Sequence, residues 1–324
     1  MKFDELFVNN SPVFLAPMAG ITDAPFRKLV HSFGASATVS EMVSSEALVR
    51  SSAKTQMRLI SLDDDNLLKI IQIVGANPEN MAESAIMSEN LGADVVDINM
   101  GCPVKKIVCN NSGSALMKDE DLAVKVAKSV VNAVKIPVTL KMRLGWDFDS
   151  INFLSLAKKF EDVGIRMLTI HCRTRSQMYS GKANWPAIEK LRDTVQIPYL
   201  CNGDIKSPES AAEALKQSRA HGVMVGRGAL GKPWLLKQIM DGLHEKSPPS
   251  SPSVKSQFEM VMNHFRETLG FYGELHGIRF FRKHFCWYSA GLPGSSSFRE
   301  AVNHIEDLSL VQKHVKEFYE KQML

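Results

Sequence analysis

A cysteine just after a predicted strand is the residue of this chain best placed to do chemistry. Cys102 lies in the run Asp97-Ile98-Asn99-Met100-Gly101-Cys102-Pro103, which continues a stretch of apolar residues. A thiol between glycine and proline lies on a stiff turn, because proline fixes its own φ and restricts the preceding residue. A thiol held in this way can deliver a proton to a bound substrate. Most cysteines are buried structural residues, so the function of this one depends on its surroundings.

Polar side chains mark the ends of several other predicted strands. Gln72 and Lys141 interrupt apolar runs, and His171 ends another. The last two strands lead into Asn202-Gly203-Asp204 and Gly226-Arg227-Gly228. Glycine lets the main chain approach a ligand closely, and arginine adds charge-assisted hydrogen bonds. These residues together predict a phosphate-containing ligand at one edge of the fold.

Lys141 has two interpretations. A buried lysine needs an anionic or polar partner, and Asp97 could supply one in a structural ion pair. Alternatively, the amine could stabilise the electron-rich N1 and O2 atoms of a reduced flavin. Similarly, the Gln72 amide could bond the edge of a heterocycle or could be structural, so each residue alone leaves both alternatives open.

Short apolar runs that alternate with helical patterns predict the elements that position these residues. Eight such alternations within about 240 residues match a (β/α)8 TIM barrel, whose ligands bind at the carboxyl ends of the strands. An open doubly wound sheet would need a G-x-G-x-x-G run after an early strand, and the first strand is followed by Met18-Ala19-Gly20-Ile21 instead. The predicted strands are 13–17, 37–41, 68–74, 95–99, 138–143, 167–171, 198–202 and 222–226.

The C-terminal part of the chain predicts a separate helical domain. A Ser-Pro-Pro-Ser-Ser-Pro run lies in a predicted linker over 244–256, which divides a barrel domain (1–243) from a domain over 257–324. In the second domain, apolar residues at helical spacing form one face, and Arg279, Arg282 and Lys283 form a neighbouring cationic stripe. Such a stripe suits phosphates, although charged helix faces are more often simply solvated.

Composition limits the class of protein. The chain has 324 residues, is 44% hydrophobic and carries a net charge of +4, so any nucleic-acid surface must be a local patch. Its 5 cysteines show no C-x-x-C pair and no zinc-like spacing, so no metal site is expected and a reducing, cytoplasmic setting fits best. Neither a signal peptide nor a membrane span is expected, and a monomer is the default.

The motifs together resemble the tRNA-dihydrouridine synthase family, most closely its bacterial B-type members. The resemblance covers nearly the whole chain, and the combination of motifs is highly specific although each tripeptide alone is not. The matching runs are Ala16-Pro17-Met18-Ala19-Gly20-Ile21-Thr22-Asp23, Pro25-Phe26-Arg27, Asn99-Met100-Gly101-Cys102-Pro103, Lys141-Met142-Arg143, His171 with Arg173-Thr174-Arg175, Tyr179-Ser180-Gly181, Asn202-Gly203-Asp204, Gly226-Arg227, and Arg282-Lys283-His284 with Trp287-Tyr288.

The resemblance implies a function and a set of site residues. Family members bind FMN, use NADPH to reduce it and reduce the C5=C6 bond of selected tRNA uridines; the B-type likeness points to the D-loop, at position 17. The implied FMN-binding residues are Pro17, Met18, Ala19, Gln72, Lys141, His171, Asn202, Gly203, Asp204, Gly226 and Arg227. The implied RNA-binding residues are Asn99, Arg143, Arg173, Arg279, Arg282 and Lys283.

The resemblance also implies a mechanism. Hydride passes from N5 of reduced FMN to C6 of a flipped uracil, and Cys102 protonates C5 as the general acid. The thiol must therefore arrive protonated, which suits an ordinary thiol pKa of about 8.5. The chain departs from the usual pattern at Cys109, where a basic residue is common, and at Cys172 and Met178, which replace smaller residues.

Two other functions remain open at this point. A flavin barrel could act on a small molecule such as dihydroorotate or an enone; it would share the phosphate loops but would not need the cationic helical domain. A non-enzymatic RNA-binding protein could also use a degenerate barrel. The set of Gln72, Lys141, His171 and Arg227 argues against the non-enzymatic alternative.

Overall fold

The structure, a computed structural model, describes residues 3–8, 11–50, 68–244 and 251–323. Its contacts divide the chain into two compact units. The first unit comprises Met1–Gly228 with Leu236–Pro248, and the second comprises Ala229–Leu235 with Pro249–Leu324. The short segment after the last barrel strand therefore groups with the C-terminal helices rather than with the barrel.

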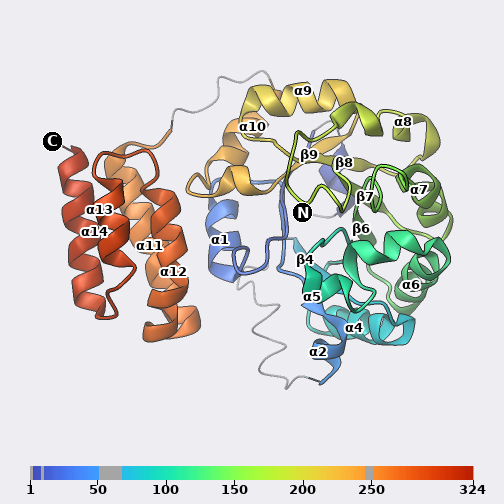
Figure 1. Cartoon of the computed structure of the whole chain (residues 1–324), viewed down its shortest axis with the longest axis horizontal. Helices are drawn as coiled ribbons and strands as arrows, with labels where there is room; N and C mark the ends of the chain where they lie inside the picture. Colours follow the sequence, from blue (N-terminus) through green and yellow to red (C-terminus); the bar gives the residue numbers. More distant parts are fainter. Residues whose placement is uncertain (1–2, 9–10, 51–67, 245–250, 324) are drawn as a thin grey trace. The chain divides into compact units, whose positions relative to one another are not determined.

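The first unit is a closed parallel barrel, as predicted. Eight strands pair side by side in parallel, and the pairings β1–β9 and β2–β4 close the ring (Figure 1). The strands are β1 Val13–Leu15, β2 Ala37–Val39, β4 Lys69–Val74, β5 Val95–Met100, β6 Val138–Arg143, β7 Met167–His171, β8 Tyr199–Asn202 and β9 Gly222–Val225.

The predicted strands match these eight, with small differences at their ends. The first two strands end at Leu15 and Val39, two residues earlier than predicted. One further strand, β3 Val43–Ser44, pairs with β4 and was not predicted, because two residues carry no periodic pattern.

Helices lie between the strands and surround the barrel (Figure 1). Several begin at a capping side chain, as when Asp119 accepts a hydrogen bond from Leu122 N and Ser207 shares a capping box with Ser210. The helices are α1 Ala24–Ser32, α2 Ser45–Arg50, α4 Pro78–Asn90, α5 Lys105–Val108, α6 Glu120–Ala133, α7 Phe153–Asp162, α8 Leu191–Thr194, α9 Pro208–Ser218 and α10 Leu235–Leu243, with short 3-10 helices at Phe3–Phe7, Gly113–Lys118, Trp185–Ile188 and Arg227–Ala229.

The barrel interior changes from apolar to polar toward the carboxyl ends of its strands. Alternate residues of a barrel strand face inward. One apolar cluster includes Ile70, Val95, Met167 and Leu200, each on a different strand. Two residues further along the same strands, on the same face, are Gln72, Asp97, Thr169 and Asn202. The sequence thus places polar groups at one end of the barrel, where they need hydrogen-bond partners.

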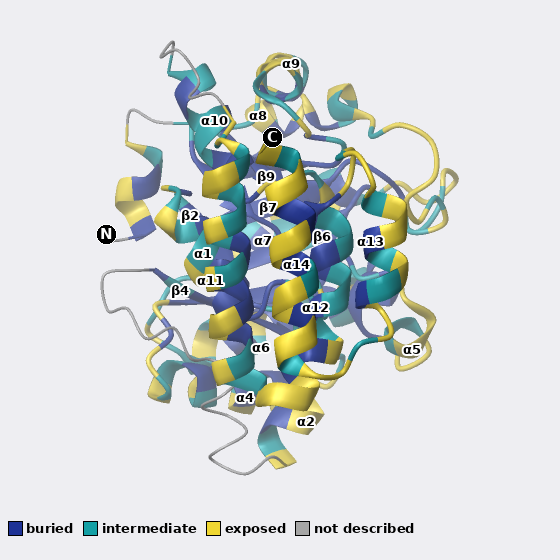
Figure 2. Ribbon diagram, turned by 90° about the vertical axis from the view of Figure 1, so that its left-hand side faces the viewer, coloured by how far each residue is buried: buried dark blue, intermediate teal, exposed yellow. Residues whose placement is uncertain are grey.

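The second unit contains four helices around an aromatic core. They are α11 Val254–Tyr272, α12 Glu274–Tyr288, α13 Ser295–Val302 and α14 Leu308–Met323. Buried and exposed residues alternate along α11 and α14 (Figure 2). The core includes the predicted apolar face, Ile278, Phe281, Phe285 and Tyr288. No helix of the described ranges is long and apolar enough to cross a membrane.

Truncation of a core ring in the second unit should destabilise it. Phe281 is fully buried and packs edge-on against Phe285 at a centroid distance of 4.7 Å. We expect Phe281→Ala to lower the free energy of unfolding of this unit by about 3–5 kcal/mol, measured by chemical denaturation. Leu310→Ala on α14 is the control: this residue is 52% exposed, and the change should stay within about 0.5 kcal/mol. Equal effects of the two variants would contradict the packing described here.

Candidate functional site

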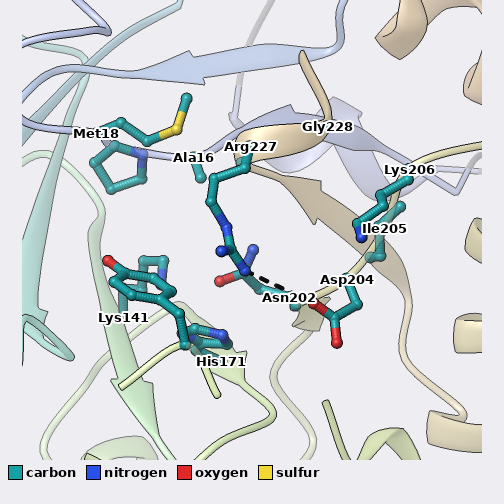
Figure 3. A pocket seen from close by; sticks show the side chains of 14 residues that line it. Ala16, Met18, Lys141, His171, Asn202, Asp204, Ile205, Lys206, Arg227 and Gly228 are labelled. Atoms are coloured by element: carbon teal, nitrogen blue, oxygen red, sulfur yellow. Dashed lines mark ion pairs between the residues drawn. The ribbon is translucent and has the colours of Figure 1, made fainter. Parts of the chain in front are cut away.

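A pocket opens where the carboxyl ends of the strands meet, and most of the predicted cofactor-binding residues line it. Figure 3 shows the Arg227 side chain projecting into it, with Met18 on one side and Lys141 and His171 on another. The lining residues are Ala16, Pro17, Met18, Lys141, His171, Tyr179, Asn202, Gly203, Asp204, Ile205, Lys206, Gly226, Arg227 and Gly228. Of the predicted set, Ala19 and Gln72 are not among them.

Loops after β8 and β9 provide a cationic end to this pocket. Arg227 has a 53% exposed side chain, lies over the Tyr179 ring at 4.7 Å and pairs with Asp204 Oδ1 at 3.8 Å. Lys206 lines the same end. Because the Arg227–Asp204 contact is long, the guanidinium retains donors that can reach a ligand anion.

Gly203 allows the loop after β8 to pass close to His171. Its φ is +120°, a conformation that residues with a side chain rarely adopt. A Cβ at this position would lie 2.9 Å from the Ala183 Cβ and 3.0 Å from the His171 Cδ2. The glycine is therefore required both by its dihedral angle and by the space available.

Lys141 reaches the pocket without an ionic partner. The alternative pair with Asp97 does not form: among the described residues, neither an ion pair nor a hydrogen bond of the Lys141 amine is found. Burial, together with the charge of Arg143, lowers the pKa of Lys141 to about 8. An amine that has lost much of its water and lacks a protein acceptor suits a ligand with electron-rich atoms.

His171 presents a neutral ring to the pocket. Burial and the charges of Lys141, Arg143, Arg173 and Arg227 hold its pKa well below the usual range. Arg173 Nη1 lies 3.4 Å from His171 Nε2, so that nitrogen is the acceptor and the proton lies on Nδ1. The ring therefore keeps one N–H donor, at Nδ1, and adds no charge to the pocket.

The turn that carries Cys102 is held from both sides. The Asn99 Oδ1 accepts hydrogen bonds from Gly101 N at 3.1 Å and from Cys102 N at 2.9 Å. The Cys102 carbonyl accepts from Ser114 Oγ at 2.8 Å. Burial raises the pKa of the Cys102 thiol, although a hydrogen bond from Val104 and the charges of Arg143 and Lys141 oppose this shift. The thiol is therefore protonated at neutral pH, on a turn whose main chain is held in place.

Gln72 does not line the pocket and belongs to a chain of buried side chains. Its Nε2 donates to Asp97 Oδ2 at 2.6 Å, and its Oε1 accepts from Asn99 Nδ2 at 2.7 Å. Asp97 also accepts from Thr139 Oγ1 at 2.6 Å. Burial raises the pKa of Asp97, and the hydrogen bonds from Thr139 and Gln72 oppose this shift. The structure thus connects Gln72 to the cysteine turn through Asn99.

Arg143 and Arg173, for which substrate binding stays a prediction, hold main-chain carbonyl groups. Each is 1% exposed. Arg143 donates to the carbonyls of Gly101, Thr174 and Met178 at 2.8, 2.8 and 2.9 Å. Arg173 donates to the carbonyls of Ser180 and Gly181 at 3.1 and 2.7 Å, and to the Asp204 carboxylate at 2.6 Å. Both arginines therefore fix the loop that follows β7.

The predicted cationic stripe of the second unit is partly neutralised. Arg279 pairs with Glu306 at 2.9 Å. Arg282 donates to the Ile305 carbonyl at 3.1 Å and lies 3.7 Å from the same carboxylate. Lys283 lies over the Phe280 ring at 3.3 Å. One carboxylate therefore competes for two of the three cations.

A group of rim residues was not predicted. Trp146 receives Arg175 over its ring at 4.4 Å and Lys118 at 4.9 Å. The loops are joined there by hydrogen bonds from Arg175 N to Gly145 O (2.9 Å) and from Ser176 N to Trp146 O (2.8 Å). The run Arg173-Thr174-Arg175 was the only signal in the sequence. Tyr179 and Lys206, which line the pocket, were likewise not assigned a role.

The three departures from the family pattern lie in different environments. Cys109 is exposed after α5, and Met178 is 38% exposed with a φ of +52°. Cys172 is buried, with its sulfur 3.6 Å from that of Cys201. Within the described part of the chain, no three His, Cys, Asp or Glu side chains gather as a metal site would require.

The partly buried Lys141 should destabilise the ligand-free protein near neutral pH. Its folded pKa of about 8 lies below the ordinary lysine value, so the unfolded chain binds more protons between these two pH values. Lys141→Met should therefore raise the free energy of unfolding at pH 7 by about 1–3 kcal/mol, and the gain should shrink as pH rises from 8 toward 10.5. Chemical denaturation across this range measures it, with exposed Lys128→Met as the control. A gain independent of pH would contradict this interpretation.

Comparisons with known proteins identify the family. The family model described as "Dihydrouridine synthase (Dus)" matches residues 14–323. A probable tRNA-dihydrouridine synthase of Rickettsia bellii is 47% identical over 310 residues, which is 96% of this chain and 95% of that protein. The tRNA-dihydrouridine synthase B of Pseudomonas aeruginosa is 42% identical, over 95% of this chain and 92% of that protein.

Among solved structures, the chain resembles an amine oxidase, HisD of Pseudomonas geniculata, in fold alone. The TM-score is 0.55 at 13% identity, and the match covers 76% of this chain and 50% of that one. The family resemblance expected from the motifs is confirmed by the family model and by the sequence relatives. This chain belongs to the dihydrouridine synthase family.

Proposed function

We propose that this protein reduces the C5=C6 bond of a uridine in the D-loop of tRNA, with FMN in the barrel pocket and NADPH as the reductant. The observation that carries the proposal is the pairing of two features at one end of the barrel. One is a cationic pocket into which Lys141 brings an unpaired amine. The other is the thiol of Cys102, on a turn held by Asn99; burial raises its pKa, and the nearby charges of Arg143 and Lys141 oppose this shift.

The pocket residues fit a flavin mononucleotide. Arg227 and Lys206 would hold its phosphate, together with main-chain N–H groups near Gly203 and Gly228. Lys141 and neutral His171 would bond the polar atoms of its ring. The flavin would thereby supply the acceptor that the Lys141 amine lacks within the protein. Bound there, FMN supplies the hydride that reduces the pyrimidine.

Cys102 would donate the proton that completes the reduction. Hydride addition at C6 leaves negative charge on C5 and O4, and the Sγ–H proton passes to C5. Burial raises the pKa of Cys102, so the thiol arrives protonated at neutral pH. Asn99 and Ser114 hold the main chain of its turn in place.

The RNA would contact both units. Uridine must leave the folded tRNA to enter the barrel mouth. Arg175 and Lys118 at the Trp146 ring offer cations for the phosphates beside the target nucleotide. Arg279, Arg282 and Lys283 would hold the body of the tRNA. We propose position 17 as the target from the B-type resemblance of the motifs, which is consistent with the likeness to a protein named tRNA-dihydrouridine synthase B.

We further propose the domain organisation, the oligomeric state and the location that the sequence suggests. The barrel over 1–243 is the catalytic domain, 244–256 is a linker, and 257–324 is the tRNA-binding domain, in a cytoplasmic monomer. Residues 245–250 of this linker lie outside the described residues, and α11 begins at Val254, before its predicted end. The sequence relatives named as tRNA-dihydrouridine synthases do not favour the alternative of a small-molecule substrate.

Replacement of the proposed acid should separate flavin binding from catalysis. Cys102→Ala should keep the flavin absorption spectrum and its reduction by NADPH, while dihydrouridine formation falls at least about 100-fold, the lower range of general-acid contributions. Mass spectrometry of tRNA measures the product. Cys109→Ala, at the exposed cysteine of the neighbouring loop, is the matched control. Unchanged turnover in Cys102→Ala would remove the assigned role.

Affinity for tRNA should respond to the Glu306 carboxylate. Arg279→Ala should weaken binding about three- to tenfold and lower the salt dependence by about one charge. Glu306→Gln should strengthen binding, because it releases Arg279 and Arg282 from a competing anion. Kd at two salt concentrations tests both variants, with Lys316→Ala on α14 as the control. Unchanged affinity in both would exclude this stripe from RNA binding.

A further inference from the structure

The chain of buried side chains beneath the Cys102 turn has a defined beginning and end. It runs from Asp97 through Gln72 to Asn99, with 2.6 and 2.7 Å between successive donors and acceptors. Asn99 then accepts from the two main-chain N–H groups of Gly101 and Cys102. Each of these three side chains is at most 6% exposed, so water cannot replace a missing partner.

The charge of Asp97 fixes the direction of every hydrogen bond in this chain. An ionised carboxylate only accepts, so Gln72 must turn its NH2 group toward Asp97. The Gln72 oxygen then faces Asn99, which must turn its own NH2 group toward Gln72. This leaves the Asn99 oxygen facing the cysteine turn, where two N–H donors require an acceptor.

We propose that Asp97 is a positioning residue for the proposed acid Cys102, and that it acts through the orientation of two amide side chains. The role rests on the proposed function only in so far as Cys102 is the proton donor. Thr139 holds the other Asp97 oxygen, so the carboxylate cannot rotate away from Gln72. Asp97 itself lies two residues before Asn99 on the same strand, and within the described part of the chain its carboxylate makes no hydrogen bond to the turn.

Two variants separate this role from a general effect on stability. Asp97→Asn lets the amide at position 97 present either its oxygen or its NH2 group to Gln72, so Asn99 is no longer forced to offer its oxygen to the turn. The double variant Asp97→Asn with Gln72→Glu moves the carboxylate one step along. The carboxylate at position 72 then accepts both from the new amide at position 97 and from Asn99, which restores the orientation of Asn99.

The first measurement requires no cofactor or substrate. In flavin-free protein, Cys102 alkylation by iodoacetamide is followed by peptide mass spectrometry, with exposed Cys109 as the internal reference. We expect Asp97→Asn to increase the rate of Cys102 alkylation about tenfold. This factor corresponds to the loss of one buried hydrogen bond of about 1.4 kcal/mol that holds the turn. The double variant should return to within about twofold of wild type on the same scale.

The second measurement uses the flavin-loaded enzyme. Reoxidation of the reduced flavin by tRNA should slow about tenfold in Asp97→Asn, since it needs the positioned thiol, whereas reduction by NADPH should stay within about twofold. Thr169→Val is the matched control: Thr169 is buried in the same barrel interior, and its hydroxyl finds no hydrogen-bond partner among the described residues. Both rates and the alkylation rate should be unchanged in that control.

The outcomes are distinct. Wild-type alkylation in Asp97→Asn, or no recovery in the double variant, would overturn the positioning role whatever reaction the protein catalyses. A flavin that tRNA fails to reoxidise in wild type would instead overturn the proposed function and leave the alkylation result to decide on Asp97. If Asp97→Asn does not fold, Gln72→Met interrupts the same chain, and a Cys102 rate equal to wild type in that variant would also overturn the proposal.

Discussion

Polar and charged groups buried at one end of the barrel must find partners, and this requirement organises the molecule. Strand alternation puts apolar side chains and polar ones on the same inward face, in successive layers. Burial of a carboxylate or guanidinium without partners lowers the stability of the fold by several kcal/mol, so each needs a nearby hydrogen-bond or ionic partner. Asp97 accepts hydrogen bonds from Thr139 and Gln72, and Arg143 donates to three carbonyl groups.

Groups at this end of the barrel differ in how fully their bonding capacity is used. Arg143 and Arg173 use their N–H donors inside the protein, in hydrogen bonds to loops. Lys141 and Arg227 keep capacity for a ligand, and both line the pocket. Two kinds of cation therefore lie side by side, one that builds the site and one that is available to bind. This division leaves cations in the pocket whose donors are not used up inside the protein.

The sequence predicted the barrel and most of the pocket, because both depend on local patterns. Apolar runs of strand length gave all eight barrel strands, and glycines beside arginine marked the loops after β8 and β9. The main-chain partners of Arg143 and Arg173 could not be predicted, since these acceptors are carbonyls that every residue carries. The direction of the Asp97–Gln72–Asn99 chain also depends on register between β4 and β5, which sequence spacing does not specify. Likewise, Glu306 lies 27 residues from Arg279, too far for a helical pattern to connect them.

The grip of Arg143 and Arg173 on main-chain oxygens has an evolutionary consequence. The loop from Thr174 to Gly181 keeps its path through its carbonyl groups, whatever side chains those residues carry. Substitutions at its exposed positions can therefore accumulate without loss of the loop's shape, provided that the dihedral angles remain accessible. A protein lineage could in this way exchange the surface chemistry around the barrel mouth while the two buried arginines stay constant.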